Sequence, residues 1–211
     1  MYRSDRIAAN LAAIRSRIER AGGEPDQIEI VAATKNRSVE ECRSAVAAGL
    51  TTLGENRVQE AVAKMDEVPG ARWHLIGHLQ TNKVRHAARF ELIQSLDSLR
   101  LAEALSVRGG RAVLLEVNVS RERQKHGVDP EAALDTAASV SALLDLRGFM
   151  GMAPLGDDPQ PAFVELRRLR DEAEQRLGRA LPVLSMGMSE DLEAAVRAGS
   201  TMLRVGRALF T

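Results

Sequence analysis

The chain has 211 residues, and 45% of them are hydrophobic, which is enough to form one sizeable core. Its 29 acidic and 29 basic residues balance, so there is no net charge to attract nucleic acid or a membrane surface. We therefore expect a single globular domain over residues 1–211, with neither nucleic acid nor a membrane as a partner.

Two features predict a cytoplasmic protein. The first twenty residues carry charges every few positions, unlike a secretory signal, and no segment holds the roughly 18 uninterrupted apolar residues of a membrane span. The one cysteine, Cys42, can form no disulfide within the chain, as expected in a reducing compartment. Cys42 follows an acidic pair in a helical stretch, and we interpret it as a structural residue.

Eight short runs rich in Val, Ile and Leu are bounded by Gly, Asn or Ser, a pattern that predicts β-strands. In chain order they lie at 28–34, 51–56, 73–77, 91–96, 112–118, 146–151, 182–187 and 201–206. An amphipathic helix precedes the first run, and helical spacing predicts further helices at 38–48, 55–68, 130–144, 161–177 and 189–198. Alternating strands and helices indicate a parallel sheet.

We predict an α/β fold, a single (β/α)8 barrel of the TIM type with an extra N-terminal helix. An open, doubly wound sheet is the alternative, because spacing alone does not show closure. In both architectures ligands bind at the carboxyl ends of the strands, so the polar residues that follow the apolar runs are the candidate site residues.

Lys35 is the first of these candidates. It directly ends the first run, whereas the other three lysines, Lys64, Lys83 and Lys125, do not end a strand. An amine at a partly desolvated barrel mouth is held more readily in its neutral, nucleophilic form, which suits imine formation with an aldehyde. The alternative is a structural lysine whose stem packs along the strand end while its charge stays in water.

The last strand and the turn before it supply further candidates. Ser189, followed by Asp191 and Glu193, is typical of a helix N-cap with an acidic first turn, and free backbone amides there and at Gly206 would bind a phosphate. An ordinary capped helix with a tight turn is the alternative. Arg204 lies in an apolar run, where an unpaired charge is costly, so it needs a partner: a carboxylate such as Glu116, or a ligand atom.

The histidines do not predict a metal site. His74 and His78 have i,i+4 spacing, but a strand-like segment and Gly77 separate them, which favours structural or ligand-lining roles over zinc. His86 and His126 lie in polar helical or loop contexts without a cluster. The motifs of serine nucleophiles, nucleotide-binding loops and redox cysteine pairs are absent from the sequence.

Several long motifs resemble one family in the same order along nearly the whole chain. They are VAATKN at 31–36, LGENRVQE at 53–60, WHLIGHLQTNK at 73–83, EVNVS at 116–120, GFMGMAP at 148–154 and LSMGMSEDLEAAVRAGSTMLRVGRALF at 184–210. They closely resemble the pyridoxal phosphate homeostasis proteins, also called proline synthase co-transcribed homologues. One departure is the loop RERQKHGV, where the family more usually has a small residue between Lys125 and Gly127.

The resemblance implies a barrel like the N-terminal domain of alanine racemase, with pyridoxal 5'-phosphate (PLP) held as a Schiff base on Lys35. The other cofactor-binding residues that it implies are Ser189 and Gly206 for the phosphate, Arg204 facing the pyridine nitrogen, Asn56 lining the ring, and Met186 and His78 nearby. An arginine at the pyridine nitrogen would keep that nitrogen unprotonated and weaken the ring as an electron sink.

The resemblance also implies a role in intracellular vitamin B6 and amino-acid homeostasis, with PLP-dependent apoenzymes as recipients and a monomer or weak dimer as the assembly. Racemisation needs an acid or base on each face of the substrate, and alanine racemases take the second from a tyrosine on an additional domain. The one tyrosine here is Tyr2, at the N-terminus. We therefore favour a PLP carrier without a catalytic residue over a weak PLP-dependent racemase or transaminase-like enzyme, and an interaction module comes third.

Overall fold

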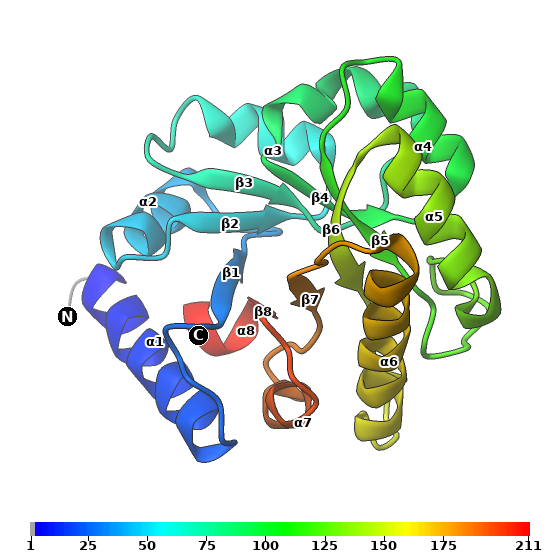
Figure 1. Cartoon of the computed structure of the whole chain (residues 1–211). Coiled ribbons are helices and arrows are strands. Elements are labelled where there is room, and N and C mark those ends of the chain that lie inside the picture. Colours follow the sequence, from blue (N-terminus) through cyan, green and yellow to red (C-terminus); the bar gives the residue numbers. More distant parts are fainter. Residues whose placement is uncertain (1–2) are drawn as a thin grey trace.

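The computed structural model describes residues 3–211, in which eight parallel strands close into a barrel in chain order (Figure 1). The strands are β1 (Glu29–Ala33), β2 (Thr52–Glu55), β3 (Arg72–Leu75), β4 (Leu92–Leu96), β5 (Ala112–Glu116), β6 (Asp145–Met150), β7 (Val183–Ser185) and β8 (Met202–Val205). Closure is made by β1, which pairs in parallel with both β2 and β8. The predicted (β/α)8 barrel is confirmed, and the open doubly wound sheet is excluded.

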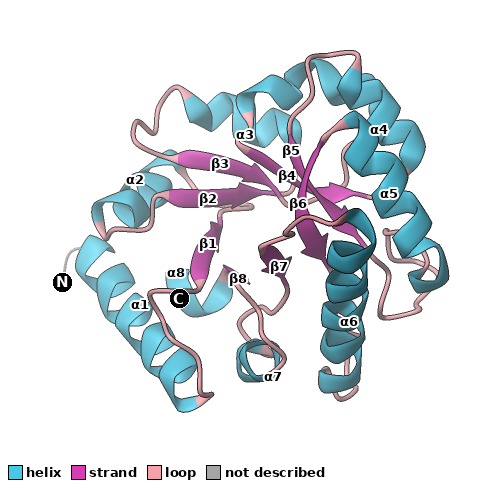
Figure 2. Cartoon of the chain, viewed as in Figure 1, coloured by secondary structure: helices cyan, strands magenta, loops and turns pink. Residues whose placement is uncertain are grey.

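Helices surround the barrel and connect its strands (Figure 2). They are α1 (Arg3–Arg20), α2 (Val39–Ala47), α3 (Val58–Met65), the 3-10 helix η1 (Thr81–Arg89), α4 (Leu99–Ser106), the 3-10 turn η2 (Pro130–Ala132), α5 (Ala133–Leu143), α6 (Gln160–Leu177), α7 (Leu192–Arg197) and α8 (Arg207–Phe210). The extra helix predicted before the first strand is α1. Its Ile7, Ile14 and Ile18 are buried at helical spacing, and it packs against α2, α7 and α8.

Two predicted helix starts were wrong. The helix expected from residue 55 begins at Val58, because Glu55 is the fully buried last residue of β2. The helix expected from Ser189 begins at Leu192, with Asp191 as its N-cap residue. The Asp191 side chain accepts a hydrogen bond of 2.5 Å from the backbone N–H of Met188, so a turn occupies the residues between them.

The apolar residues form two clusters. The larger packs the strands against the surrounding helices, and its fully buried members include Phe149, Phe163 and Leu75. The smaller consists of residues from five strands, as expected for side-chain layers in a barrel interior: Val31, Leu92, Leu114, Met150 and Met202. Packed apolar side chains therefore fill the barrel interior, and the mouth at the carboxyl ends of the strands is the part left for a ligand.

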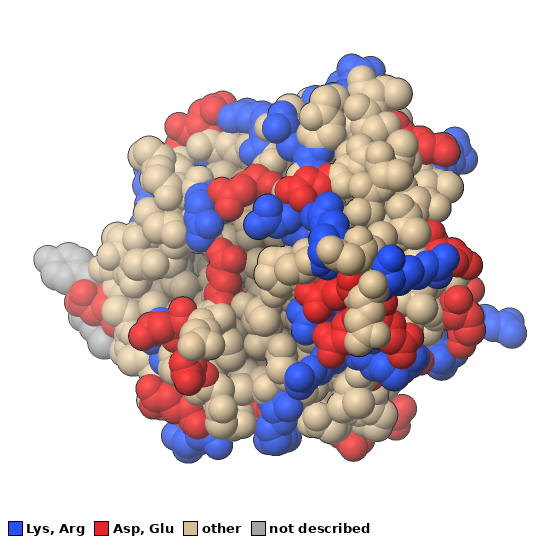
Figure 3. Space-filling view, in the orientation of Figure 1, with Lys and Arg blue, Asp and Glu red and all other residues tan. Residues whose placement is uncertain are grey.

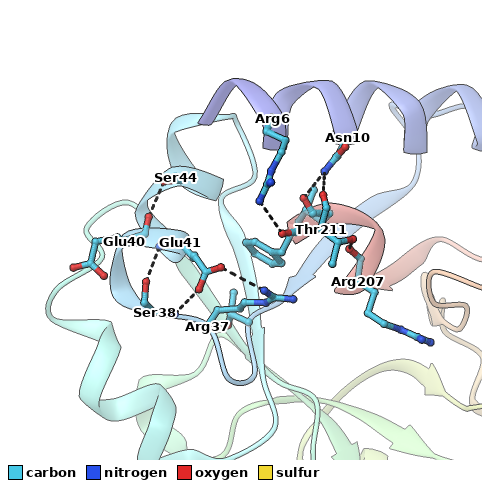
Figure 4. Close-up of polar contacts among 12 residues, drawn as sticks. Arg6, Asn10, Arg37, Ser38, Glu40, Glu41, Ser44, Arg207 and Thr211 are labelled. Carbon is cyan, nitrogen blue, oxygen red and sulfur yellow. Dashed lines mark hydrogen bonds and ion pairs between the residues drawn. The ribbon is translucent and has the colours of Figure 1, made fainter. Parts of the chain in front are cut away.

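The end of the chain is fastened to α1 next to this mouth (Figure 4). Arg6 donates a hydrogen bond to the carbonyl of Phe210, and Asn10 donates to the carbonyls of Leu209 and Thr211. The guanidinium of Arg37 lies 5.0 Å from the centre of the Phe210 ring. These contacts fix α8, and with it the segment that follows β8.

Charged residues of both signs are interspersed over the face seen in Figure 3. In residues 3–211, none of the helices combines the length and apolar character needed to cross a membrane.

Candidate functional site

A cavity of about 320 Å³ opens at the carboxyl ends of the strands, between the loops that follow β1, β6, β7 and β8. Lys35, Ser189, Arg204 and Gly206 all line it. These four candidates come from segments far apart in the sequence, and closure of the barrel brings them together. The remaining lining residues are Ala33, Ala153, Pro154, Leu155, Gly156, Asp157, Pro159, Met188, Glu190, Asp191 and Arg207.

Lys35 is exposed, and the strand end before it is held by hydrogen bonds among Thr34, Glu55 and Lys64. The hydroxyl of Thr34 donates to Glu55 Oε1 at 2.7 Å, and Lys64 Nζ lies 2.6 Å from the same oxygen and donates to the Thr34 carbonyl at 3.0 Å. Asn36, with φ of 59°, then turns the chain in the left-handed region that asparagine tolerates. Lys35 therefore projects from a fixed strand end into a turn.

The Glu55–Lys64 pair was not predicted from the sequence. Glu55 is fully buried, and its second oxygen, Oε2, has no hydrogen-bond partner in the described part of the chain. A buried carboxylate is costly unless a cation neutralises it, so Lys64 is committed to this pair. Lys125 is also engaged, by Glu122 and by the carbonyl of Ala153.

Arg204 is buried in β8 and bonds to backbone carbonyls rather than to a carboxylate. Its Nη1 donates to the Ser185 carbonyl at 2.8 Å and to the Ser185 hydroxyl at 2.6 Å, and its Nη2 donates to the Gly151 carbonyl at 3.0 Å. These bonds use three of the five N–H donors of the guanidinium. Burial lowers the pKa of Arg204 to about 10, while Glu116 and Asp191 oppose that change. The group stays cationic at neutral pH and can donate further hydrogen bonds into the cavity.

Glu116 was one of the two partners considered for Arg204, and it makes no ion pair with it within 4.0 Å in the described structure. Burial raises the pKa of Glu116, nearby Asp97 raises it further and Arg204 lowers it, and the resulting pKa is about 7. The Glu116 carboxyl therefore affects the pKa of Arg204 through space, and the charge of Glu116 itself changes near neutral pH.

Ser189 does not cap α7 as predicted. Its hydroxyl oxygen instead accepts a hydrogen bond of 3.2 Å from the backbone N–H of Ala208 in α8. The serine thereby joins the loop after β7 to the segment after β8. Arg207, on that segment, pairs with Glu190 at 2.5 Å across the same side of the cavity.

The other three candidates do not line this cavity. Asn56 is partly exposed after β2. Met186 is fully buried and belongs to the larger apolar cluster. His78 lies after β3 beside Asp97 and His126, a cluster that the sequence did not predict. Tyr2, which entered the argument about racemisation, lies outside the described residues.

Cys42 is buried in α2, and burial raises the pKa of its thiol to about 11. A thiol with so high a pKa is unreactive at neutral pH, so the structure agrees with a structural role.

Comparison with known proteins defines the class to which this barrel belongs. The alanine racemase N-terminal domain family matches residues 3–211. The pyridoxal phosphate homeostasis protein of Deinococcus radiodurans is 40% identical over 211 residues, which cover 97% of this chain and 99% of the relative. The corresponding protein of Escherichia coli K12 is 37% identical over 224 residues, with 97% and 95% coverage. The chain therefore belongs to the pyridoxal phosphate homeostasis proteins, as the sequence motifs indicated.

Solved structures agree with this placement. PipY of Synechococcus elongatus PCC7942, described with PLP bound, has a TM-score of 0.85 and 37% identity, and the match covers 97% of this chain and 100% of PipY. Alanine racemase of Corynebacterium glutamicum has a TM-score of 0.79 at 17% identity, which shows a shared fold. The match covers 98% of this chain and 60% of the racemase.

Proposed function

We propose that this chain binds PLP at the barrel mouth, as a Schiff base with Lys35, and serves as a carrier in vitamin B6 homeostasis. The observation that carries the proposal is that Lys35 and Arg204 line one cavity with Ser189 and Gly206, in a chain 37% identical to a protein described with PLP bound. In the condensation, the amine of Lys35 forms a bond to the aldehyde carbon, and the aldehyde oxygen leaves as water.

The donors around the cavity fit the cofactor's groups. The Ser189 hydroxyl and the backbone at Gly206 lie on one side of the cavity and would receive the phosphate, and Arg207, paired with Glu190, lies beside them. Arg204 has only N–H donors and keeps its proton, so it would hold a ring nitrogen in its unprotonated form. Bound PLP would supply an aldehyde and an electron-withdrawing ring, and Arg204 would weaken the electron-withdrawing effect of the ring. Asn56 beside the ring, with His78 and Met186 nearby, remains a prediction.

A carrier is favoured over an enzyme by what surrounds Lys35. No histidine, tyrosine or cysteine of residues 3–211 lines the cavity. Two of its three carboxylates are engaged, Glu190 by Arg207 and Asp191 by the backbone of Met188. The third, Asp157, is exposed on the loop after β6. An open cavity whose carboxylates are either engaged or exposed suits exchange of the aldehyde with solvent or an apoenzyme. We propose cytoplasmic apoenzymes as recipients and a monomer or weak dimer as the assembly.

The experiment compares wild type, Lys35→Ala and, as a matched control, Lys83→Ala. Each is titrated with PLP, and the imine absorption band is followed. The loaded protein is then mixed with a PLP-dependent apoenzyme whose recovered activity reports transfer. We expect the band and transfer in wild type and Lys83→Ala, and neither in Lys35→Ala. Turnover of an amino acid at ordinary enzymatic rates by wild type would overturn the carrier role.

A further inference from the structure

A second constellation lies at the same mouth, on the side formed by β3, β4 and β5. It consists of His78 after β3, Asp97 directly after β4, and His126 in the loop after β5. None of the three lines the Lys35 cavity. His78 Nδ1 lies 2.8 Å from Asp97 Oδ2, and His126 Nδ1 lies 3.8 Å from the same oxygen. The imidazole rings are stacked with 4.2 Å between their centres and an interplanar angle of 9°.

These distances are close to those of a metal-ligand set. In a tetrahedral zinc site with bonds of about 2.0–2.1 Å, neighbouring ligand atoms lie about 3.3 Å apart. The 2.8 Å of the His78–Asp97 hydrogen bond and the 3.8 Å between His126 and Asp97 fall on either side of that value, and one ligand atom from each residue lies within 4.8 Å of the others. Because the lone pairs of parallel rings do not converge on one point, the rings must tilt apart around an ion. His126 has room to do so, since its side chain is 57% exposed.

The Asp97 side chain and the backbone beside both histidines are held by their neighbours. The Ser98 hydroxyl donates to Asp97 Oδ1 at 3.2 Å, which leaves Oδ2 facing the imidazoles. A Cβ at Gly77, next to His78, would lie 2.4 Å from the carbonyl oxygen of Asn56. Gly127, next to His126, has φ of +114°, and a Cβ there would lie 2.7 Å from the backbone nitrogen of Asn118. The glycine next to each histidine therefore packs too closely against backbone to carry a side chain, which fixes the chain there, and the Ser98 hydrogen bond orients the carboxylate.

The donor set selects the kind of ion. Two imidazoles and one carboxylate suit Zn²⁺, Co²⁺ or Ni²⁺, whereas Mg²⁺ and Ca²⁺ prefer oxygen ligands throughout. Asp97 is 12% exposed and His78 is 38% exposed, so an ion can reach the site from water and keep water in its remaining coordination positions. We infer that His78, Asp97 and His126 form a binding site for a divalent transition metal ion, beside the Lys35 cavity, which none of the three lines.

The test uses the full chain without a polyhistidine tag, stripped with a chelator and dialysed. ZnCl2 is titrated by calorimetry, and CoCl2 is followed by its visible absorption. We expect saturable binding of one ion per chain, unaffected by millimolar Mg²⁺. In Asp97→Asn and His126→Asn the affinity should fall by more than the about 10- to 100-fold that follows loss of a supporting partner. The exposed His126 makes its variant the safer one for folding, which thermal unfolding in chelator checks.

The control variants separate this site from other binding. His86→Gln removes a histidine outside the cluster and should bind zinc as wild type does. Lys35→Ala should also bind zinc unchanged, so loss of PLP binding and loss of metal binding are distinguishable. In nitrogen-15 spectra of the imidazoles, zinc should shift His78 and His126 and leave the buried His74 in place. Absence of saturable binding in wild type, or equal zinc affinity in wild type, Asp97→Asn and His126→Asn, would overturn the inference.

Discussion

Replacing Lys64 by methionine should destabilise the protein by leaving the Glu55 carboxylate buried without its cation. The side chain of Glu55 is fully buried and that of Lys64 is 11% exposed, with 2.6 Å between Nζ and Oε1. Breaking a buried pair on one side typically costs about 3–5 kcal/mol. Some water reaches the ammonium and Thr34 still donates to Glu55, so we expect the lower end, about 3 kcal/mol.

The assay is equilibrium unfolding in urea, followed by circular dichroism, for wild type, Lys64→Met, Glu55→Gln and the double variant. The double variant should recover at least half of the loss in the free energy of unfolding, because a neutral amide tolerates burial without a cation. The partly exposed Lys83 provides the control, and Lys83→Met should change stability by less than about 0.5 kcal/mol. A loss below about 1 kcal/mol in Lys64→Met, or no recovery in the double variant, would refute the reasoning that this pair fixes the strand end of Lys35.

Three further predictions follow from single residues. Because the pKa of Glu116 is raised from 4.5 to about 7, its contribution to stability is present below the lower pKa and lost as pH rises through the upper one. The free energy of unfolding of Glu116→Gln should therefore vary less with pH than that of wild type. Above pH 8 the variant should be more stable than wild type by up to about 3 kcal/mol, at about 1.4 kcal/mol per unit of pKa shift. Gly77→Ala should lose about 1–3 kcal/mol in urea unfolding, because its Cβ would lie 2.4 Å from the Asn56 carbonyl oxygen. Cys42 should react with a thiol reagent only on unfolding, and rapid labelling of the native protein would contradict its burial and raised pKa.

Strands were easier to predict than helix starts, for a physical reason. Strands of a parallel barrel are buried on both faces, so they appear as continuous apolar runs, and all eight were located to within two residues. Helix starts depend on which polar residue caps the backbone. Glu55 lay in both the predicted strand 51–56 and the predicted helix 55–68, and it completes β2. Ser189 was predicted as an N-cap, but its hydroxyl accepts from the backbone of Ala208.

The site was predictable to the extent that it follows strand ends. Lys35, Ser189, Arg204 and Gly206 were expected together because the carboxyl ends of parallel strands meet at one mouth, and they line one cavity. The partners of Arg204 were not predictable, since they include backbone carbonyls that leave no trace in the sequence. The cluster around Asp97 was not predicted for a different reason: its third member, His126, lies in the loop after β5, and the sequence does not show where that loop runs.

The central claim is that Lys35 is the residue that takes the aldehyde. The most direct measurement is borohydride reduction of the protein loaded with PLP, followed by mass mapping of the modified peptides. We predict one adduct on Lys35, because Lys64 and Lys125 are engaged by carboxylates and carbonyls and Lys83 does not line the cavity. An adduct on another lysine, or one spread over several while Lys35 stays unmodified, would contradict the account.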